Sequence, residues 1–524
     1  MTKFFNTAGP CRADEHYMLP PERRLSEVRP LIERKAFFVV NAPRQTGKTT
    51  SLLSLARSLT QEGRYAALHV SCKPAASSDD SDRGIETLLQ AIRDEAQFQL
   101  PNTLVPQIEE GSSNIVAEFR LRHVLSQWSE SCPRPVVLFL DEFDALSGKT
   151  LLSVLDQLHS GYTARPAPFP HSVALIGLRD VRDYRVGNDE RLGTSSPFNI
   201  KLGSLRLRDF TPDEVKELYI QHEEETGQAF TEDAIERAFE LTLGQPWLVN
   251  ALASQAISEE ALEGTEVTAE HIESAKEALI LRRDTHIDSL IDRLREKRVR
   301  RVIEPIVAGH LPTDDVLDDD VQFVKDLGLV RKGAMGLEIA NPIYHEVVPR
   351  ALSSVTEDFI PVARDPYISS DGRLLFSKMI EGFALFWRQH AEHFLKRQPY
   401  SEAAAQLIFM AYLQHIVNGG SPAGPATIDR EYAVGSGRID LCIRWPLASN
   451  RSERFAIELK VWRKGSSDPR DVGIEQLCGY LTRLDLRSGT LIIFDQREST
   501  AEPATVEGPA AVKRDRFTIG VWRL

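Results

Sequence analysis

Residues 42–50 have the types and the order that phosphate binding requires. The segment reads APRQTGKTT, follows an apolar run at 37–40 and precedes an amphipathic helical pattern. Backbone N–H groups at a helix N-terminus bind phosphate, a lysine after the last glycine reaches the β- and γ-phosphates, and the next hydroxyl binds Mg²⁺. The segment therefore predicts a phosphate-binding loop (P-loop) for ATP. The residues expected to bind the nucleotide are Ala42, Arg44, Gln45, Thr46, Gly47, Lys48, Thr49 and Thr50.

The first position of this loop departs from the usual pattern, because Ala42 stands where a glycine is common. Alanine can serve there if the backbone does not need a positive φ at that position. We therefore expect the loop to keep its function. The hydroxyl of Thr49 is the expected Mg²⁺ ligand from this segment.

A second motif supplies the acidic groups that a nucleotide site needs. A continuous apolar run at 136–140 ends in Asp141 and Glu142. Such a run predicts a buried parallel strand, and ligands bind at the carboxyl ends of these strands. We expect Asp141 to reach Mg²⁺ together with Thr49, and Glu142 to polarise the attacking water. The two motifs together predict ATP hydrolysis.

Two further residues have both a functional and an ordinary interpretation. Arg179 follows the apolar run of a third predicted strand and could stabilise the γ-phosphate, because arginine always carries its charge. The alternative is a surface arginine after a core strand. Pro246, in the segment GQPW, stands before a helical pattern and is also a common first residue of a helix. On the residues alone, these alternatives stay open.

Three charged residues near the C-terminus form a second candidate site. In the strand pattern RFAIELKVW at 454–462, Glu458 and Lys460 share one face, because side chains alternate along a strand. An upstream strand pattern contains Asp440, and a turn-rich connection predicts a hairpin that brings Asp440 near Glu458. Two carboxylates can hold Mg²⁺ or Mn²⁺, and Lys460 can then orient or activate water. The alternative is an exposed sheet face.

This C-terminal pattern resembles the PD-(D/E)XK nuclease superfamily. An aspartate follows a glycine, an E-x-K strand comes next, and a later helical stretch carries Gln476 and Tyr480 four residues apart. The proline that usually precedes the aspartate is absent, since Ile439 stands there. The resemblance implies a metal-dependent phosphodiesterase. Its implied catalytic residues and metal ligands are Asp440, Glu458, Lys460 and, as an additional acidic ligand, Glu402.

The N-terminal part resembles STAND-type ATPases, a branch of the AAA+ class. The resemblance rests on GLRD around Arg179, on GQPW around Pro246 and on the N-terminal segment that contains NTAGP. It implies an arginine that senses the γ-phosphate, a proline that packs against adenine, and an N-terminal segment that touches the base. The whole chain also resembles a bacterial group in which an AAA-like domain precedes a PD-(D/E)XK nuclease-like domain. The shared motifs include APRQTGKTT, DEFDAL, GQPWLVN and IELK.

Composition limits the class of protein and its partners. The 524 residues are 42% hydrophobic and 27% charged, which is typical of a globular chain. The net charge of −13 gives no global attraction to nucleic acid or membrane, so a site for a polyanion must be local. Five cysteines, never at C-x-x-C spacing, favour a reducing compartment. Neither a signal core nor a long apolar run stands out. We expect a cytoplasmic protein without membrane contact.

The elements that must position these residues predict an α/β multidomain chain. We expect an AAA-like P-loop NTPase core at 1–205, a helical lid at 206–285 and a winged-helix-like domain at 286–355. A linker at 356–373 leads to an α/β PD-(D/E)XK nuclease-like domain at 374–524. Six basic residues crowd the start of the winged-helix-like part, either as DNA contacts or as a solvated helix face or domain interface. They are Arg293, Arg295, Lys297, Arg298, Arg300 and Arg301.

Two functions fit these expectations. The first is a nuclease controlled by ATP and dependent on Mg²⁺, with DNA as the expected substrate and RNA left open. Defence against foreign DNA and a nucleotide-dependent homo-oligomer belong to this hypothesis by analogy. The second is a regulatory STAND-type ATPase whose C-terminal domain binds nucleic acid or a partner without cleavage. The complete set of Asp440, Glu458 and Lys460 favours the first, because a module that only binds does not need all three.

Overall fold

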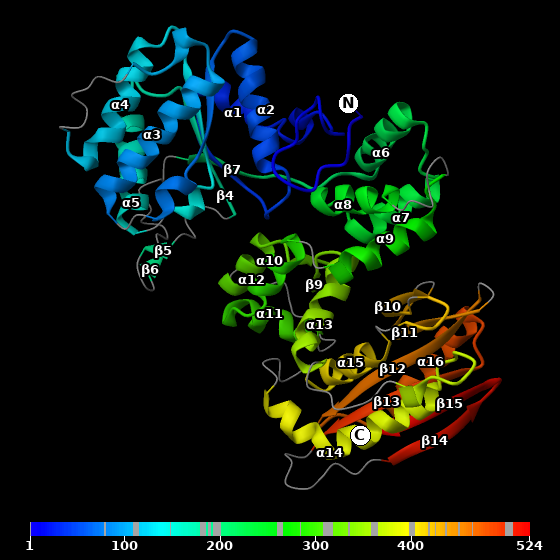
Figure 1. Ribbon diagram of the computed structural model, residues 1–524. Helices are drawn as coiled ribbons and strands as arrows, with labels where there is room; N and C mark the ends of the chain where they lie inside the picture. The colour runs from blue at the N-terminus through cyan, green and yellow to red at the C-terminus, as the bar shows by residue number, and fades with distance from the viewer. Residues whose placement is uncertain are drawn as a thin grey trace. The chain divides into compact units, whose positions relative to one another are not determined.

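A computed structural model gives the fold and divides the chain into two compact units (Figure 1). The first unit comprises Met1–Leu279 and Gln322–Val330, and the second comprises Ile280–Val321 and Arg331–Leu524. The structure describes the chain apart from residues 1, 78–79, 108–114, 147, 179–184, 187–189, 192–200, 259–265, 283–284, 308–317, 334–335, 358–364, 398–403, 418–419, 425, 435–436, 449–450, 464 and 498–506.

A five-stranded parallel sheet forms the centre of the first unit. Its strand order is β2-β3-β4-β1-β7. The strands are β1 (Phe37–Asn41), β2 (Ala66–Ser71), β3 (Val136–Asp141), β4 (Ser172–Gly177) and β7 (Lys201–Arg206), and a short pair, β5 (Arg185–Val186) and β6 (Glu190–Arg191), lies outside this sheet. Because the strands are parallel, their carboxyl ends meet at one edge of the sheet.

Helices cover both faces of this sheet, which makes a three-layer α/β core (Figure 1). Phe37 and Val39 pack with the helices on one face, whereas Phe38 and Val40 pack with those on the other. Burial on both faces explains the continuous apolar runs in the sequence. The helices on the first face are α3 (Ser81–Gln99), α4 (Ala117–Ser131) and α5 (Gly148–Thr163), and those on the second are α1 (Val28–Glu33) and α2 (Lys48–Gln61).

Four helices follow the sheet and occupy the region expected for the lid. They are α6 (Pro212–Thr226), α7 (Glu232–Thr242), α8 (Pro246–Ile257) and α9 (Ala269–Arg282). Thr211 begins α6 with a capping box, in which its side chain accepts from the backbone N–H of Glu214 and the Glu214 side chain accepts from that of Thr211. Gly227 ends α6 in the left-handed conformation. Capping residues that are adjacent in the sequence therefore set the start and the end of α6.

The second unit begins with helices and a two-stranded sheet. The elements in this part of the chain are α10 (Thr285–Arg293), α11 (Lys297–Val307), α12 (Asp319–Asp326), β8 (Val330–Lys332), β9 (Leu337–Ile339) and α13 (Pro342–Glu357). Most of α12 and the first residue of β8 belong to the first unit. Arg301 forms ion pairs with Asp318 and Asp320, and Arg298 pairs with Asp320. These carboxylates neutralise part of the basic cluster, so it offers less free positive charge than its sequence indicates.

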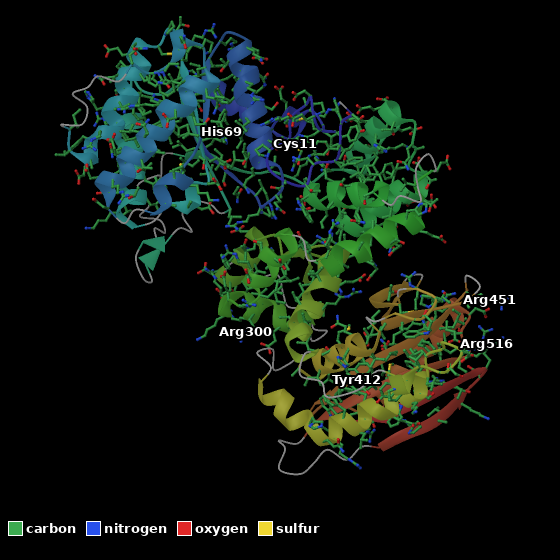
Figure 2. All side chains as sticks on the ribbon, viewed as in Figure 1. Cys11, His69, Arg300, Tyr412, Arg451 and Arg516 are labelled. Atoms are coloured by element: carbon green, nitrogen blue, oxygen red, sulfur yellow. The ribbon has the colours of Figure 1, made fainter. Side chains whose placement is uncertain are left out.

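A six-stranded mixed sheet forms the rest of the second unit, in the order β10-β11-β12-β13-β15-β14. The strands are β10 (Thr427–Val434), β11 (Gly437–Leu447), β12 (Arg451–Arg463), β13 (Ser488–Gln496), β14 (Glu507–Arg514) and β15 (Phe517–Arg523). The helices α14 (Phe376–Arg397) and α15 (Ala404–Val417) pack on one face, and α16 (Arg470–Leu484) packs on the other. Tyr412 of α15 lies in the core on the first face (Figure 2).

No helix in the described ranges is both long and apolar enough to cross a membrane.

Candidate functional site

The P-loop lies between β1 and α2, as the sequence predicts. Gly47 is the N-cap of α2 and has a φ of 81°, in the left-handed region that favours glycine. Ala42 is absent from the described non-glycine residues with positive φ, so alanine needs no strained backbone there. Thr46 Oγ1 donates to the Pro43 carbonyl at 2.9 Å and closes the loop. The loop therefore keeps its shape without the first glycine.

The Lys48 ammonium lies inside this loop. Its Nζ donates to the carbonyl oxygens of Ala42 and Pro43, each at 2.6 Å. Burial lowers the pKa of Lys48 to about 8, although the Asp141 and Asp144 carboxylates oppose the shift. An anion bound at the loop would raise the pKa of Lys48 again, because it favours the charged form of the lysine.

The carboxylate expected to bind Mg²⁺ lies beside the expected hydroxyl. Thr49 Oγ1 donates to Asp141 Oδ2 at 2.7 Å, and the same oxygen lies 3.0 Å from His69 Nε2. Asp141 is 2% exposed. Burial disfavours its ionised form, but the hydrogen bonds from His69 and Thr49 outweigh that effect and lower the pKa of Asp141. The two oxygens are ligands that suit Mg²⁺.

Glu142 follows Asp141 at the same sheet edge. It has a φ of 52°, which turns the chain sharply after β3. Ser71 Oγ, at the end of β2, donates to Glu142 Oε2 at 2.5 Å, and Lys73 Nζ lies 4.0 Å from its other oxygen. The Glu142 side chain is 46% exposed. It is therefore accessible to water while one hydroxyl holds its orientation.

The GQP turn contacts the P-loop directly. Pro246 is the first residue of α8, and Gln245 is its N-cap, whose side chain accepts from the Leu248 N–H at 2.6 Å. Gln245 Nε2 also donates to the Gln45 carbonyl of the P-loop at 3.5 Å. Gly244 has a φ of 78°. The motif is therefore a helix start, and at the same time it joins the helical region to the nucleotide loop.

The N-terminal segment also joins the P-loop helix to the helical region. The Cys11 N–H donates to Thr50 Oγ1 at 3.0 Å, and Trp247 Nε1 donates to the Thr7 carbonyl at 2.8 Å. Phe5 packs among aromatic rings that include Tyr219 of α6. The segment thus contacts α2 as well as α6 and α8 within one unit.

The three charged residues of the C-terminal site lie together on the face of the sheet that α16 covers. The register that pairs Leu441 with Ile457 sets Asp440 opposite Glu458 when it is continued by one residue. Asp440 Oδ2 accepts from the Leu459 N–H at 2.7 Å, and Lys460 Nζ donates to Glu458 Oε1 at 2.8 Å. The predicted hairpin is therefore present and brings the three side chains together.

Glu458 is buried, so the interpretation of an exposed sheet face is wrong for this residue. It is 2% exposed, and its Oε2 has no hydrogen-bond partner. Burial and the nearby Asp440 carboxylate raise the pKa of Glu458, against the opposing effect of Lys460. A buried oxygen without a partner costs free energy, which a bound cation would recover.

Helix α16 approaches the site closely at one glycine. A methyl group at Gly473 would lie 2.8 Å from Leu491 Cδ1 and 3.4 Å from Lys460 Cγ. The helix therefore limits the space beside Lys460. On the same helix, Gln476 is exposed and Tyr480 is half-buried.

The donors at both sites fit a divalent cation that prefers oxygen. Thr49 and Asp141 supply a hydroxyl and a carboxylate, and Asp440 and Glu458 supply two carboxylates, one with an unpaired buried oxygen. In the described part of the chain, no group of three or more His, Cys, Asp or Glu side chains could hold a metal. The rest of either coordination shell would come from water or phosphate.

Two expected site residues lie outside the described residues, namely Arg179 and Glu402. Three polar groups that sequence reasoning did not single out lie at the nucleotide site: His69, Ser71 and Gln245. The signal for the first two was a polar residue near the end of the apolar strand pattern at 66–71. Their neighbours in space come from a different strand, so only the sheet order reveals the contacts.

Comparison with known families supports the N-terminal assignment. Residues 31–184 match the family model described as an AAA domain. No curated protein that was compared matches the sequence. This range contains the P-loop and the strand that ends in Asp141. It is therefore an AAA-type P-loop domain that binds ATP.

Several solved structures resemble the chain at low sequence identity. The Walker-type ATPase PABY2304 of Pyrococcus abyssi has 15% identity, covers 66% of this chain and 99% of its own, and has a TM-score of 0.49. The RuvB Holliday junction branch migration motor of Thermotoga maritima has 14% identity, coverages of 62% and 93%, and a TM-score of 0.34. Cdc6p from Pyrobaculum aerophilum has 13% identity, coverages of 68% and 98%, and a TM-score of 0.37.

Proposed function

We propose that the chain hydrolyses ATP in its AAA-type part and thereby controls a metal-dependent phosphodiesterase in its C-terminal part. Within the first site, Lys48 binds the β- and γ-phosphates, and Thr49 and Asp141 bind Mg²⁺. Glu142 polarises the attacking water, because its carboxylate is exposed beside the acidic strand end. Arg179 and Pro246 keep the proposed roles of γ-phosphate sensor and adenine contact.

One observation carries the proposal for the C-terminal site. Glu458 Oε2 is buried without a partner, beside Asp440 and Lys460. An exposed sheet face needs no such arrangement, and a structural core would pair or replace the carboxylate. A cation-binding site supplies the missing partner. We therefore assign Asp440 and Glu458 as ligands of Mg²⁺ or Mn²⁺, with Glu402 as a further proposed ligand.

Phosphodiester cleavage fits this combination of two carboxylates and a lysine. A bound divalent cation supplies Lewis acidity and lowers the pKa of coordinated water. Lys460 lies 2.8 Å from Glu458, on the same face, and would orient water or the phosphate rather than bind the metal. This set of residues resembles the PD-(D/E)XK nucleases, and nucleic acid is the substrate that the resemblance implies. We propose DNA as that substrate, with RNA as an outcome of the test.

A packed helix offers a route for control within the second unit. Helix α13 ends the proposed winged-helix-like part, and Arg350 on this helix donates to the Ile428 carbonyl of β10 at 2.9 Å. Strand β10 pairs with β11, which carries Asp440. A shift of α13 would therefore act on the strand next to the site. Nucleotide-dependent assembly of copies and a role in defence against foreign DNA are part of the same proposal, by analogy alone.

The alternative is a regulatory ATPase whose C-terminal part binds nucleic acid or a partner without cleavage. The buried Glu458 favours cleavage, since a surface for binding alone gains nothing from an unpaired buried carboxylate. The two proposals differ in what a substitution of Lys460 changes. In the first, the lysine acts on water or phosphate, so its loss should abolish cleavage and leave the affinity for metal unchanged.

Matched variants of the full chain test both sites. Glu142→Gln should bind ATP and hydrolyse it at a small fraction of the wild-type rate, whereas Lys48→Ala should lose both binding and hydrolysis. Lys460→Ala should bind Mn²⁺ as the wild type does and lose cleavage of DNA, whereas Asp440→Asn should lose both. Wild-type hydrolysis by Glu142→Gln would refute its role. Wild-type cleavage by Lys460→Ala would refute the role of this lysine, and a wild type that cleaves no DNA would refute the phosphodiesterase assignment.

A further inference from the structure

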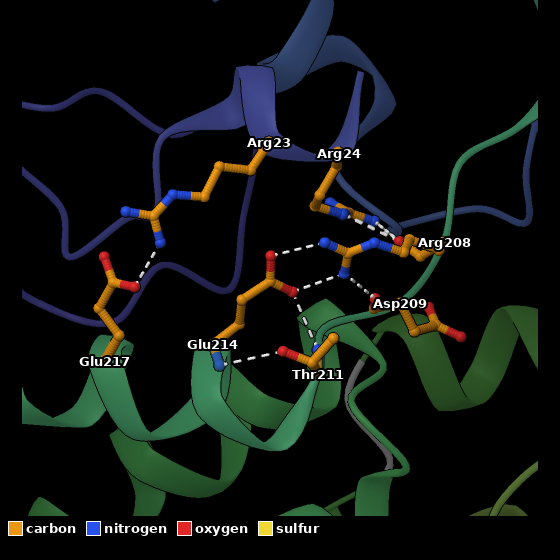
Figure 3. A network of polar contacts seen from close by, with 7 residues as sticks. All are labelled: Arg23, Arg24, Arg208, Asp209, Thr211, Glu214 and Glu217. Carbon is orange, nitrogen blue, oxygen red and sulfur yellow. Dashed lines mark hydrogen bonds and ion pairs between the residues drawn. The ribbon is translucent and has the colours of Figure 1, made fainter. Parts of the chain in front are cut away.

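Arg24 contacts the segment that connects the sheet to the lid helices. It ends the short 3-10 helix η1 (Pro21–Arg24) and is half-buried. Its Nε donates to the Arg208 carbonyl at 2.9 Å, and its Nη2 donates to the same oxygen (Figure 3). Arg208 lies between β7 and α6. The guanidinium therefore anchors the N-terminal segment to this connection, which we call the lid hinge, residues 207–211.

The remaining nitrogen of Arg24 lies at the P-loop. A methyl group at Gly47 would lie 3.2 Å from Arg24 Nη1, so the guanidinium touches the glycine that precedes Lys48. Gly47 is the N-cap of α2, at the end where backbone N–H groups converge on phosphate. Arg24 thus places a second cation beside the loop, in addition to Lys48.

The same side chain touches the GQP turn through Phe210. The Arg24 guanidinium lies 5.0 Å from the centre of the Phe210 ring, which is within the range of a cation–π contact. The Phe210 N–H donates to the Gly244 carbonyl at 2.8 Å. Gln245 of this turn donates to Gln45 of the P-loop. Arg24 therefore sits within a closed set of contacts between the loop, the hinge and the start of α8.

Burial lowers the pKa of Arg24, and the nearby Asp209 and Glu214 carboxylates oppose this shift without forming an ion pair with the guanidinium. Among the described residues, no carboxylate forms an ion pair with it, and the oxygen that it binds is a neutral carbonyl. By contrast, the adjacent Arg23 pairs with Glu217, and Arg208 pairs with Glu214 through two bonds of 2.6 and 2.7 Å (Figure 3). A half-buried cation without an ion-pair partner is stabilised by an anionic ligand.

We propose that Arg24 binds the β-phosphate of the nucleotide through Nη1 while Nε and Nη2 hold the lid hinge. This inference rests on ATP binding at the P-loop, and it adds a phosphate ligand from the N-terminal segment. Arginine suits the role because its planar group offers donors in two directions at once. A nucleotide with a β-phosphate would then fix the N-terminal segment, the P-loop and the lid hinge together.

Competition binding with the full chain separates this role from a structural one. A fluorescent ADP analogue is displaced by ADP or by AMP, in the wild type and in Arg24→Gln, Arg24→Ala and Arg23→Gln. The Arg24 variants should bind ADP about tenfold to hundredfold more weakly, the loss expected for one charge-assisted hydrogen bond. Their affinity for AMP should equal that of the wild type, because AMP has no β-phosphate. Arg23→Gln, the matched control, should bind both nucleotides as the wild type does.

Other outcomes assign the failure to a single claim. Affinity for ADP within twofold of the wild type in both Arg24 variants would overturn the inference. Equal losses for ADP and AMP would also overturn it, because they would indicate a structural role for Arg24. Arg24→Gln keeps the size of the side chain and a donor for the Arg208 carbonyl, so it carries the test if Arg24→Ala unfolds. A wild type that binds no ADP at all would instead refute the proposed function of the P-loop.

Discussion

The protonation state of Lys48 should make the binding of ATP depend on pH. The side chain is enclosed by the loop, and its carbonyl partners do not neutralise its charge. Burial lowers its pKa to about 8. The protonated form, which attracts phosphate, is therefore the main form only below about pH 8 in the free protein. We therefore expect the binding of ATP above that pH to include the uptake of a proton.

We predict that affinity for ATP falls as the pH rises from 7 to 9, with a slope of at most about tenfold per pH unit for one proton. ATP itself changes little in this range, since phosphate groups titrate near pH 6. The measurement is the Kd by calorimetry at each pH, in buffers of different ionisation enthalpy to count the protons. A flat profile with no proton uptake would show that Lys48 stays charged.

Glu458 makes the effect of a bound metal depend on pH, and this effect should grow as the pH rises, whereas the affinity for ATP should fall. Its folded-state pKa is raised above the unfolded value, so the folded protein binds the extra proton and loses stability as the pH rises through the folded pKa. A cation needs the ionised carboxylate and should compensate at high pH. We predict that Mn²⁺ raises the unfolding temperature more at pH 8 than at pH 6, and that Glu458→Gln removes this difference. Equal Mn²⁺ shifts in Glu458→Gln and the wild type would contradict the metal site.

At this scale, the sequence predicts the types of the site residues better than their environment. The P-loop, Asp141 and the E-x-K pair follow from local patterns. The burial of Glu458 does not, because the same alternation describes a solvated strand, and α16 covers the site only in the tertiary structure. Arg24 and His69 act through partners that are distant in sequence. Local pattern contains no information about those contacts.

At the scale of elements, two glycines have the same left-handed backbone conformation but differ in the space available for a side chain. Gly227, after α6, has a φ of 79° and open space around it. Gly244, before α8, has a φ of 78°, but a methyl group there would lie 2.0 Å from the Phe210 carbonyl oxygen. Only the second position brings the GQP turn against the lid hinge. The turn therefore depends on the absence of a side chain at Gly244.

We predict that Gly227→Ala lowers the free energy of unfolding by about 1–2 kcal/mol, the cost of the left-handed conformation. Gly244→Ala should cost about 2–5 kcal/mol, because overpacking adds to that strain. It should also weaken ADP binding, since the turn holds Gln245 at the P-loop. Chemical denaturation and nucleotide titration of both variants check this. Equal stability losses in the two variants would show that the Phe210 contact relaxes at little cost.

Element boundaries were predictable where capping and periodicity are local. The strands at 37–40 and 136–140 and the capped start of α6 at Thr211 follow from runs and caps. The order of the parallel strands does not, because it depends on crossovers that the sequence does not encode locally. For the same reason, Ser71 at the end of β2 could not be assigned in advance to Glu142.

At the scale of the whole molecule, we propose an AAA-type ATP site in one unit and a metal-dependent site in the other. The two sites use separate residues and separate sheets. Substitutions at one should therefore leave the direct chemistry of the other intact. If ATP controls cleavage, substitutions at the two sites should differ in their effect on the activity of the other site. Loss of nucleotide binding should silence cleavage, whereas loss of cleavage should not affect ATP hydrolysis.

The most direct test measures cleavage of plasmid, linear DNA and RNA by the full chain in Mg²⁺ or Mn²⁺, with and without ATP. We predict that the wild type cleaves DNA only when ATP and metal are both present, and that Lys48→Ala cleaves none. Glu458→Gln should cleave none and hydrolyse ATP at the wild-type rate. A wild type that leaves every nucleic acid intact under all conditions would contradict the proposed function, and so would a Glu458→Gln variant that cleaves as fast as the wild type.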